Sequence, residues 1–166
     1  MSLQRNRWAA LAAALGVAFA ATAGWGAWQS TTSEQNRSDR YFSAEEQVIT
    51  TAKRSVEALL TYTYTEVQQK LYAAEGLTTG GFRTKYRQFL DDALISTARE
   101  KKISTNAVVV GAGIQSLAAD NAKVLLFVDQ RTTSAAEPNA KTATSSVLVG
   151  LQNVNDAWMI SQMDPL

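Results

Sequence analysis

The sequence predicts an α+β domain in which about three helices pack on a curved four-stranded antiparallel sheet, behind a single membrane-spanning helix. Three observations support this prediction: an uncharged run near the N-terminus, helical periodicity in the middle of the chain, and β-branched segments in its last third. Helices that precede strands, rather than alternating with them, are typical of helices gathered on one face of an antiparallel sheet. The predicted parts are a cytoplasmic N-terminus at 1–7, a transmembrane anchor at 8–28, a polar linker at 29–40 and an extracytoplasmic domain at 41–166.

The anchor is predicted from "WAALAAALGVAFAATAGWGAW", which runs from Trp8 to Trp28 without a charged residue. As a helix rising about 1.5 Å per residue, these 21 residues would span roughly 31 Å, which matches a hydrocarbon core of about 30 Å. Trp8 at one end, and Trp25 and Trp28 at the other, would lie at the two membrane interfaces, where aromatic side chains gather. Because Arg5 and Arg7 precede the run, we expect the anchor to lie in the plasma membrane, with the N-terminus in the cytoplasm and the domain outside.

A cleaved secretory signal is the alternative interpretation of the same segment. A charged start, an apolar stretch and the small residues "ATA" at 21–23 also fit a signal with a cleavage site. The run is only weakly hydrophobic, since ten of its 21 residues are alanine and three are glycine. It continues uncharged through residues 24–28, which is longer than a signal requires and favours the anchor. Both interpretations place the domain outside the cytoplasm.

Small residues recur every four positions along the predicted anchor, at Ala12, Gly16, Ala20 and Gly24. Such a ridge lets a second membrane helix approach closely. A run this rich in alanine also contains small residues in several other registers, so the ridge is a candidate packing face and not by itself a sign of a partner.

Three helices are predicted after the polar linker "QSTTSEQNRSDR". Ser43 and Glu46 have the spacing of a capping box at the start of the first helix, and Thr65 and Gln68 repeat that spacing for a second, shorter one. A third helix is expected near 82–102, after the glycine-containing loop "AEGLTTGG". The first helix has an apolar stripe at Val48, Ala52, Val56, Leu59 and Leu60, and the third has one at Phe82, Tyr86, Phe89, Leu90, Ala93 and Leu94.

The period changes to that of strands from Ile103 onward. One hairpin is predicted from "ISTNAVVVGAGIQSL" and "AKVLLFVDQRTT", with its turn at "AADN". A second hairpin is predicted from "KTATSSVLVGLQNV" and "AWMISQM", with its turn at "NVND". Pro138 lies in the loop between the two hairpins. The residues expected to point into the core are Val108, Val110, Leu125, Phe127, Val147, Val149, Trp158 and Ile160.

Composition excludes several kinds of chemistry. The chain has 16 basic and 15 acidic residues, a balance that does not indicate nucleic-acid binding. It contains no cysteine and no histidine, which excludes disulfides, thiol nucleophiles, Ser-His-Asp catalysis and histidine-based metal sites. The acidic doublets at 45–46 and 91–92 lack the alternating spacing of a calcium loop. No metal or cofactor is therefore predicted.

Five residues could serve proton transfer in an apolar pocket, namely Tyr62, Tyr64, Asp91, Asp92 and Asp129. A structural role is favoured for each. The tyrosines suit the edge of the core with their hydroxyls near water, and two adjacent aspartates on a helix cannot both face inward. We therefore predict no catalytic residue and no enzymatic activity.

Basic residues alternate with other side chains in "FRTKYRQF". Arg83, Lys85 and Arg87 could attract anionic headgroups or a nucleic-acid strand, but on a helix these positions spread around the axis. The favoured interpretation is a solvated face, in which Arg87 pairs with Asp91 four residues later.

The order of these segments resembles the actinobacterial Mce-associated membrane proteins. The resemblance runs from about Trp8 to Leu166, through "YFSAEEQVITTAKRSVEALLTYTY", "GGFRTKYRQFL", "VLLFVDQRTTS" and the final "AWMISQMDPL". It rests on order and pattern, and none of these pieces is a catalytic signature. Its most specific pieces are "ALLTYTYTEV", "VLLFVDQ" and the closing strand at 158–163.

The resemblance implies a cone-like α+β domain similar to nuclear transport factor 2 and to the periplasmic domain of the type IV secretion scaffold. It also implies a non-catalytic accessory subunit that assembles or stabilises an Mce-type lipid or sterol import complex, with the Mce subunits, their permease and the lipid bilayer as partners. The alternative is an exported pocket protein that binds or isomerises a lipid or steroid-like molecule, with a mature chain that starts near Gly24.

Overall fold

The computed structural model describes residues 43–166. The predicted anchor, with its ridge at Ala12, Gly16, Ala20 and Gly24 and its interface residues Trp8, Trp25 and Trp28, lies outside the described residues. Within 43–166, no helix is both long enough and apolar enough to span a bilayer.

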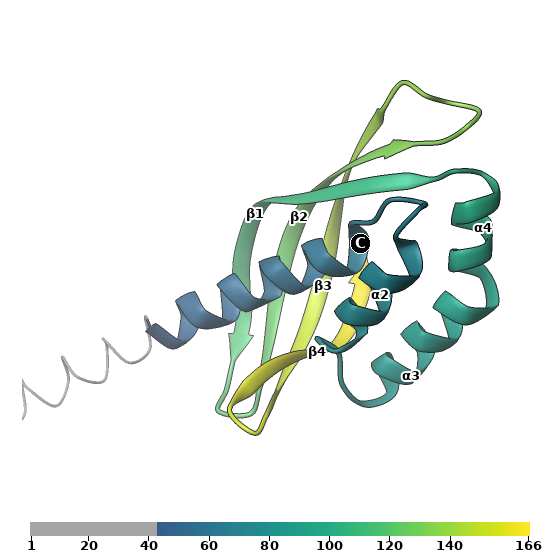
Figure 1. Cartoon of the computed structure of the whole chain (residues 1–166). Coiled ribbons are helices and arrows are strands. Elements are labelled where there is room, and N and C mark those ends of the chain that lie inside the picture. The colour runs from purple at the N-terminus through teal and green to yellow at the C-terminus, as the bar shows by residue number, and fades with distance from the viewer. Residues whose placement is uncertain (1–42) are drawn as a thin grey trace, which may run out of the picture. The chain divides into compact units, whose positions relative to one another are not determined.

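Helices precede strands along the chain, as predicted (Figure 1). Residues 43–60 are helical and lead to α2 (Val67–Glu75). Next come α3 (Gly80–Phe89), a π-helical turn η1 (Leu90–Leu94) and α4 (Ile95–Glu100), which together form the continuous third helix expected near 82–102. The strands are β1 (Ser104–Leu117), β2 (Asn121–Thr133), β3 (Lys141–Val154) and β4 (Ala157–Pro165).

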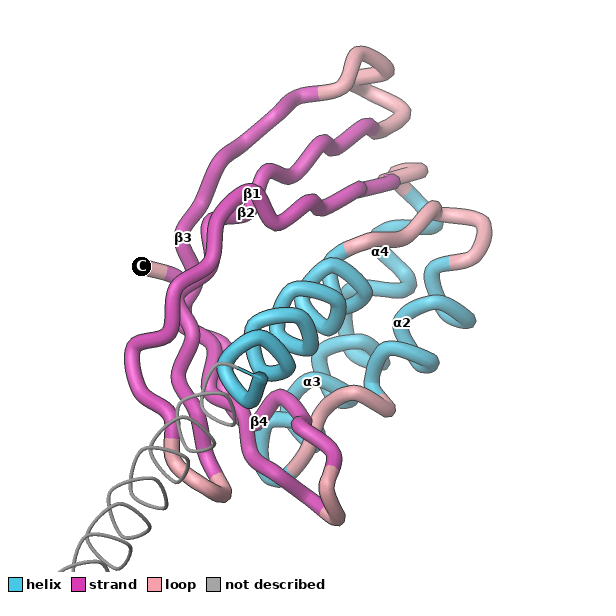
Figure 2. Tube along the Cα trace, turned by 90° about the vertical axis from the view of Figure 1, so that its left-hand side faces the viewer, coloured by secondary structure: helices cyan, strands magenta, loops and turns pink. Residues whose placement is uncertain are grey.

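The four strands form one antiparallel sheet in the order β1-β2-β3-β4. β2 also pairs with β3 across the loop that contains Pro138, so the two predicted hairpins join into a single meander. β-Bulges interrupt the pairing between Val109 and Gly111 and between Gly150 and Leu151, and bulges bend strands. Figure 2 shows the helices gathered on one side of this curved sheet, as predicted, while no described helix covers its other face.

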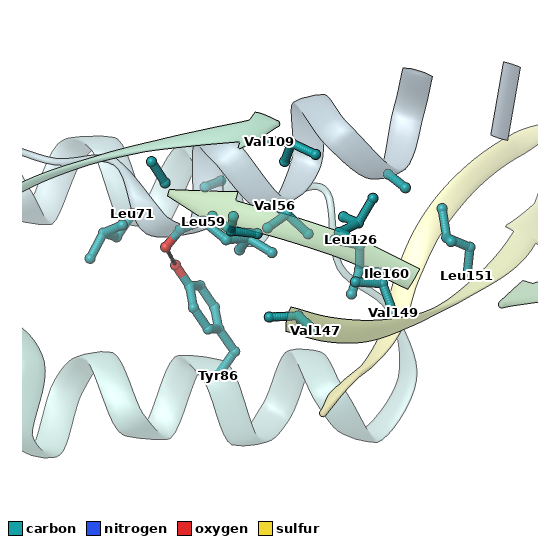
Figure 3. Close-up of a cluster of buried hydrophobic side chains, with 14 of the residues drawn as sticks. Val56, Leu59, Leu71, Tyr86, Val109, Leu126, Val147, Val149, Leu151 and Ile160 are labelled. Carbon is teal, nitrogen blue, oxygen red and sulfur yellow. Dashed lines mark hydrogen bonds between the residues drawn. The ribbon is translucent and has the colours of Figure 1, made fainter. Parts of the chain in front are cut away.

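The core lies between the inner face of the sheet and the helices (Figure 3). The 43–60 helix buries its predicted stripe, with Val48, Ala52 and Val56 inaccessible to solvent. Tyr86 of α3 donates a hydrogen bond from its hydroxyl to the carbonyl oxygen of Leu59 at 3.2 Å, which ties α3 to the end of that helix. The largest fully buried side chains of α2 and the sheet are Val67, Leu71, Val124, Leu126, Val128, Val149, Leu151 and Ile160.

Short stretches of the chain pair with both outer strands of the sheet. Tyr62 and Thr105 of β1 exchange two backbone hydrogen bonds of 2.9 Å, and beyond them the Thr61 hydroxyl and the Glu57 carboxylate accept the N–H groups of Ala107 and Val109 at 3.0 and 2.9 Å. On the opposite edge, Ile160 of β4 bonds to the backbone of residues 77–79 at 2.8 and 2.9 Å. The outward N–H groups of β1 and β4 are thus satisfied along these stretches.

The predicted inward faces of β1 and β2 are wrong. Val108, Val110 and Phe127 are 48%, 59% and 45% exposed, and their strand neighbours Ala107, Val109, Val124, Leu126 and Val128 are buried instead. Both strands are apolar at consecutive positions, so alternation alone could not define the buried face. Val147, Val149 and Ile160 point inward as predicted, Trp158 packs partly buried against the core, and Leu125 lies half-buried beside Phe127 on the outer side.

The predicted capping box at Thr65 and Gln68 does not form. Helix α2 begins at Val67 without a side-chain cap, and the Thr65 hydroxyl lies 3.1 Å from the hydroxyl of Thr63. Gln68 accepts a hydrogen bond from Arg99 instead, at 2.9 Å. Pairing of Tyr62 with β1 keeps this segment extended, so the helix starts only after a further turn.

The π-helical turn also changes the apolar stripe of the third helix. In η1 the N–H group of Ile95 donates to the carbonyl oxygen of Leu90, five residues earlier, so one extra residue enters the turn. The buried stripe therefore continues from Tyr86 and Leu90 to Ile95 and Ala98, and not through Ala93 as predicted. Phe89, also predicted inward, is 53% exposed.

Candidate functional site

An open cleft of about 810 Å³ lies between the helices and the inner side of the sheet. The 43–60 helix, α3 and η1 form one wall, and residues of β1, β2 and β4 form the other. The apolar residues of its lining are Leu59, Leu60, Phe82, Phe89, Leu94 and Met163.

Helix α3 contributes one side of its surface to this cleft. Phe82, Lys85, Tyr86 and Phe89 are spaced three or four residues apart, so they share one face of the helix, and all four line the cleft. The rings of Phe82 and Tyr86 stack with their centroids 6.1 Å apart. Lys85 was predicted only as part of a basic run, although this helical spacing already places it among the aromatic residues.

Two of the predicted tyrosines differ in their surroundings. Tyr62 lines the cleft and is 9% exposed, whereas Tyr64 is 37% exposed and its backbone N–H group donates to the Ser104 hydroxyl at 3.2 Å. Burial raises the pKa of Tyr62. Burial also raises the pKa of Tyr86, and the charges of Glu75 and Tyr62 raise it further. Both cleft tyrosines are therefore protonated at neutral pH and can donate hydrogen bonds.

The predicted acidic candidates lie away from the cleft. Asp91 and Asp92 are exposed on η1, and Asp129 accepts a hydrogen bond from Thr144 of β3 at 2.6 Å. The aspartate of the lining is Asp164, which accepts from the side-chain amide of Gln162 at 2.6 Å. Residues 43–166 contain no group of three or more acidic side chains placed to hold a metal ion.

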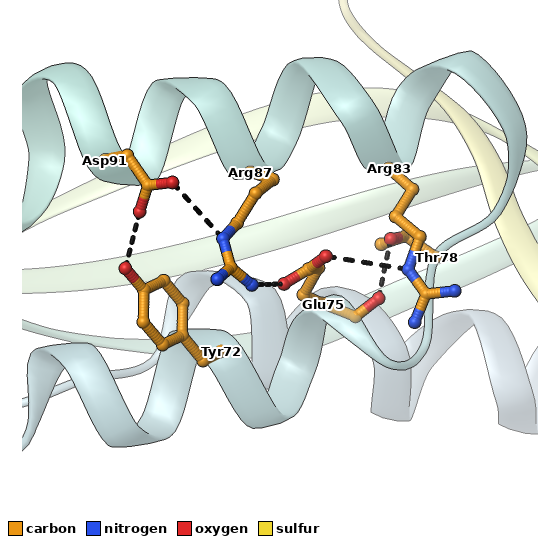
Figure 4. A network of polar contacts seen from close by, with 6 residues as sticks. All are labelled: Tyr72, Glu75, Thr78, Arg83, Arg87 and Asp91. Atoms are coloured by element: carbon orange, nitrogen blue, oxygen red, sulfur yellow. Dashed lines mark hydrogen bonds and ion pairs between the residues drawn. The ribbon is translucent and has the colours of Figure 1, made fainter.

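A polar cluster joins α2 to α3 and to the start of η1 (Figure 4). Glu75 pairs with Arg83 at 3.6 Å and with Arg87 at 2.5 Å. Arg87 also forms the predicted pair with Asp91, at 3.2 Å. Tyr72 donates its hydroxyl hydrogen to Asp91, and its ring lies 4.1 Å from the guanidinium of Arg87. The two arginines thus face α2 while Lys85 faces the cleft, so the basic run does not form one surface.

Acidification should weaken this cluster. The hydrogen bond from Tyr72 holds the pKa of Asp91 below its ordinary value of 3.8, and the hydrogen bond and positive charge of Arg87 lower this pKa further. A carboxylate with a lowered folded-state pKa contributes stability above its unfolded pKa and loses that contribution as the pH falls through the folded value. We therefore expect Asp91→Asn to reduce the loss of stability between about pH 5 and about pH 2, measured by urea unfolding across that range. Equal acid sensitivity of the two proteins would contradict this role for Asp91.

The outer side of the sheet presents a second candidate surface. We call Val108, Val110, Leu125, Phe127, Leu148 and Leu166 the outer apolar face. Leu125 and Leu148 are cross-strand partners, and together with Leu166 they line a shallow hollow of about 370 Å³. The ring of Phe127 lies over Gly111 of β1, where a Cβ atom would come within 3.1 Å of it. Four of the seven large apolar side chains that are most exposed within the described residues belong to this face, and such clustering marks an interaction surface.

Solved structures share the fold of the described domain. The periplasmic domain of DotI matches 72% of this chain and 92% of its own length, with a TM-score of 0.60 and 18% identity. CagV, a VirB8 homolog of the T4SS of Helicobacter pylori, matches 74% and 99%, with a TM-score of 0.56 and 13% identity. An NTF2-like superfamily protein from Salmonella enterica matches 73% and 91%, with a TM-score of 0.52 and 8% identity. The predicted similarity to both fold types is confirmed, and it concerns the fold alone.

The chain is also similar in sequence to proteins of Mycobacterium tuberculosis. No family model matches the chain, so its assignment to the Mce-associated proteins stays a prediction. Outer membrane protein Rv1973 of Mycobacterium tuberculosis is 40% identical over 123 residues, which cover 74% of this chain and 76% of that protein. At this identity and coverage, the chain belongs to the family that includes outer membrane protein Rv1973 of Mycobacterium tuberculosis.

Proposed function

We propose that this protein is a non-catalytic, single-pass accessory subunit that assembles or stabilises an Mce-type lipid or sterol import complex in the cell envelope. Its N-terminus is cytoplasmic, residues 8–28 anchor it in the plasma membrane, and the α+β domain lies outside. Its partners are the Mce subunits and their permease.

The comparisons support the envelope part of this proposal. The relative from Mycobacterium tuberculosis is named an outer membrane protein, and the structure of DotI that shares the fold is that of a periplasmic domain. The proposal departs from the relative's name in assigning the plasma membrane, because an uncharged run of 21 residues preceded by arginines suits a single helical anchor there.

The outer apolar face is the observation that carries the proposal of an assembly role. It holds exposed side chains from β1 and β2 and the C-terminal Leu166, and no described helix covers it. An exposed apolar patch of this kind is unfavourable in water and is stabilised by burial against another protein.

The cleft favours a second candidate function, an exported protein that binds a lipid or steroid-like molecule. Its volume lies within the range of about 300–1,000 Å³ that is typical of small-molecule sites. Binding in the cleft is compatible with an anchored protein, so this candidate does not require a cleaved N-terminus.

Recovery of the complex from membranes tests the assembly role. Tagged full-length protein, extracted in mild detergent, should co-purify with Mce subunits and permease. We expect Phe127→Lys combined with Val110→Lys to reduce that recovery at least about tenfold, because a charge at the centre of an interface loses a few kcal/mol. Thr142→Lys adds the same charge to an exposed position of β3 outside the face and should leave recovery unchanged.

Two further measurements distinguish the contribution of the anchor to recovery from that of the domain. Leucine at Gly16 and Ala20 would widen the predicted ridge and should weaken recovery if the anchor packs on a partner helix. Normal recovery with every variant, or recovery of the protein free of membranes and without its first 23 residues, would refute the assembly role.

A further inference from the structure

The cleft combines an apolar wall with polar groups that lack partners. Its apolar lining comes from separate elements, with Leu59 and Leu60 on the 43–60 helix, Phe82 and Phe89 on α3, and Met163 on β4. Phe89 is 53% exposed, although it is part of this apolar lining. An elongated apolar group placed here would contact several elements at once and remove this surface from water.

Lys85 provides the positive charge of the cleft. Its neighbours Arg83 and Arg87 are paired with Glu75 on the opposite side of α3, whereas Lys85 has no ion-pair partner among residues 43–166. The other charged residue of the lining is Asp164, which already accepts a hydrogen bond from Gln162. The cleft therefore presents one unpaired cation within a largely apolar lining.

Further donors lie in the same lining. The hydroxyl of Tyr62 and the side-chain amide of Gln130 make no hydrogen bond to a described residue, and both residues line the cleft. A bound molecule with an acceptor group can use these donors, whereas the hydroxyl of Tyr86 is already bonded to Leu59.

We propose that the cleft binds a long-chain monocarboxylate, with its carboxylate paired to Lys85 and its hydrocarbon chain packed against Phe82, Phe89 and Met163. A single negative charge fits this lining, because a second anionic group would meet Asp164 without a cation to pair with it. This inference deepens the second candidate function, because it names the class of lipid that the cleft would bind, and it is independent of the assembly role.

Photolabelling of the full-length protein in lipid nanodiscs tests the site. The probe is a palmitic acid analogue with a diazirine in its chain, and labelled peptides are identified by mass spectrometry. We expect label on the peptides of α3 and of residues 159–163, displaced by oleate but not by oleyl alcohol, which has the same chain without the charge. Lys85→Gln should reduce labelling about tenfold, as expected for loss of one charge-assisted contact. Lys123→Gln, at an exposed position of β2 outside the cleft, is the matched control.

A second variant controls for the possibility that Lys85→Gln reduces labelling by misfolding. Leu94→Trp adds bulk at the cleft lining, and it should reduce labelling with the same thermal unfolding transition as the parent protein. Absence of label from the cleft peptides, full labelling of Lys85→Gln, or equal displacement by oleyl alcohol would each overturn the proposal. Lys85→Gln should still recover the transporter subunits, and the variant at Phe127 and Val110 should still be labelled, so each proposal can fail without the other.

Discussion

Replacing Leu126 with alanine is expected to lower the free energy of unfolding by about 2–5 kcal/mol. Leu126 of β2 is fully buried between the sheet and the helices, so the truncation removes apolar contacts and leaves a cavity that the surrounding core fills only in part. Urea unfolding followed by circular dichroism, with an unchanged slope against urea, measures this loss.

The adjacent residue is the matched control. Phe127 is the larger side chain but is 45% exposed, so Phe127→Ala should cost less, about 1 kcal/mol, from its contact with Gly111 and its cross-strand neighbours. If Phe127→Ala proved the more destabilising of the two, β2 would have its other face in the core, and the outer apolar face would not exist.

The second large effect is expected from the covered edge of β1. Glu57→Leu combined with Thr61→Val removes the acceptors of the Val109 and Ala107 N–H groups. Ala107 and Val109 are 4% and 5% exposed, so their N–H groups would be left without a hydrogen bond, at a cost of about 1–3 kcal/mol each. We expect the double variant to lose about 2–5 kcal/mol in the same urea assay.

Glu57→Gln is the control for this second prediction. The glutamine keeps an oxygen acceptor at the same distance from the backbone and should retain most of the stability. A double variant as stable as the parent protein would show that solvent satisfies these N–H groups, and that the helix does not protect the edge.

The element order could be predicted from the sequence because each element has its own local signal. The apolar stripe from Val48 to Leu59 has helical spacing, and "AADN" and "NVND" are turns between β-branched runs. Helices followed by strands then leave few arrangements in which all apolar faces are buried together. The pairing of Arg87 with Asp91 was likewise local, since it depends only on a spacing of four residues.

The buried face of β1 and β2 could not be predicted in the same way. "VVV" at 108–110 and "VLLFV" at 124–128 are apolar on both sides, so the choice between Leu126 and Phe127 depends on which side the helices cover. The late start of α2 depends on the pairing of Tyr62 with Thr105, which lies more than forty residues away in sequence.

The lining of the cleft could be predicted only in part, and Tyr62 is the one pocket candidate from the sequence that belongs to it. The lining joins Leu60, Phe82, Gln130 and Met163, which lie far apart in the sequence and carry no shared motif. The part of the lining on α3 has a local signal in the sequence, because Phe82, Lys85, Tyr86 and Phe89 recur at helical spacing.

The capped borders of the sheet limit how this domain can be recognised. The outward backbone groups of β1 are hydrogen-bonded to Glu57, Thr61 and Tyr62, and those of Ile160 are hydrogen-bonded to residues 77–79. A strand from another protein therefore cannot pair with the backbone along these stretches. Along these stretches, β-augmentation and runaway edge-to-edge polymerisation are blocked. A binding protein that meets the sheet at these stretches must instead recognise side chains.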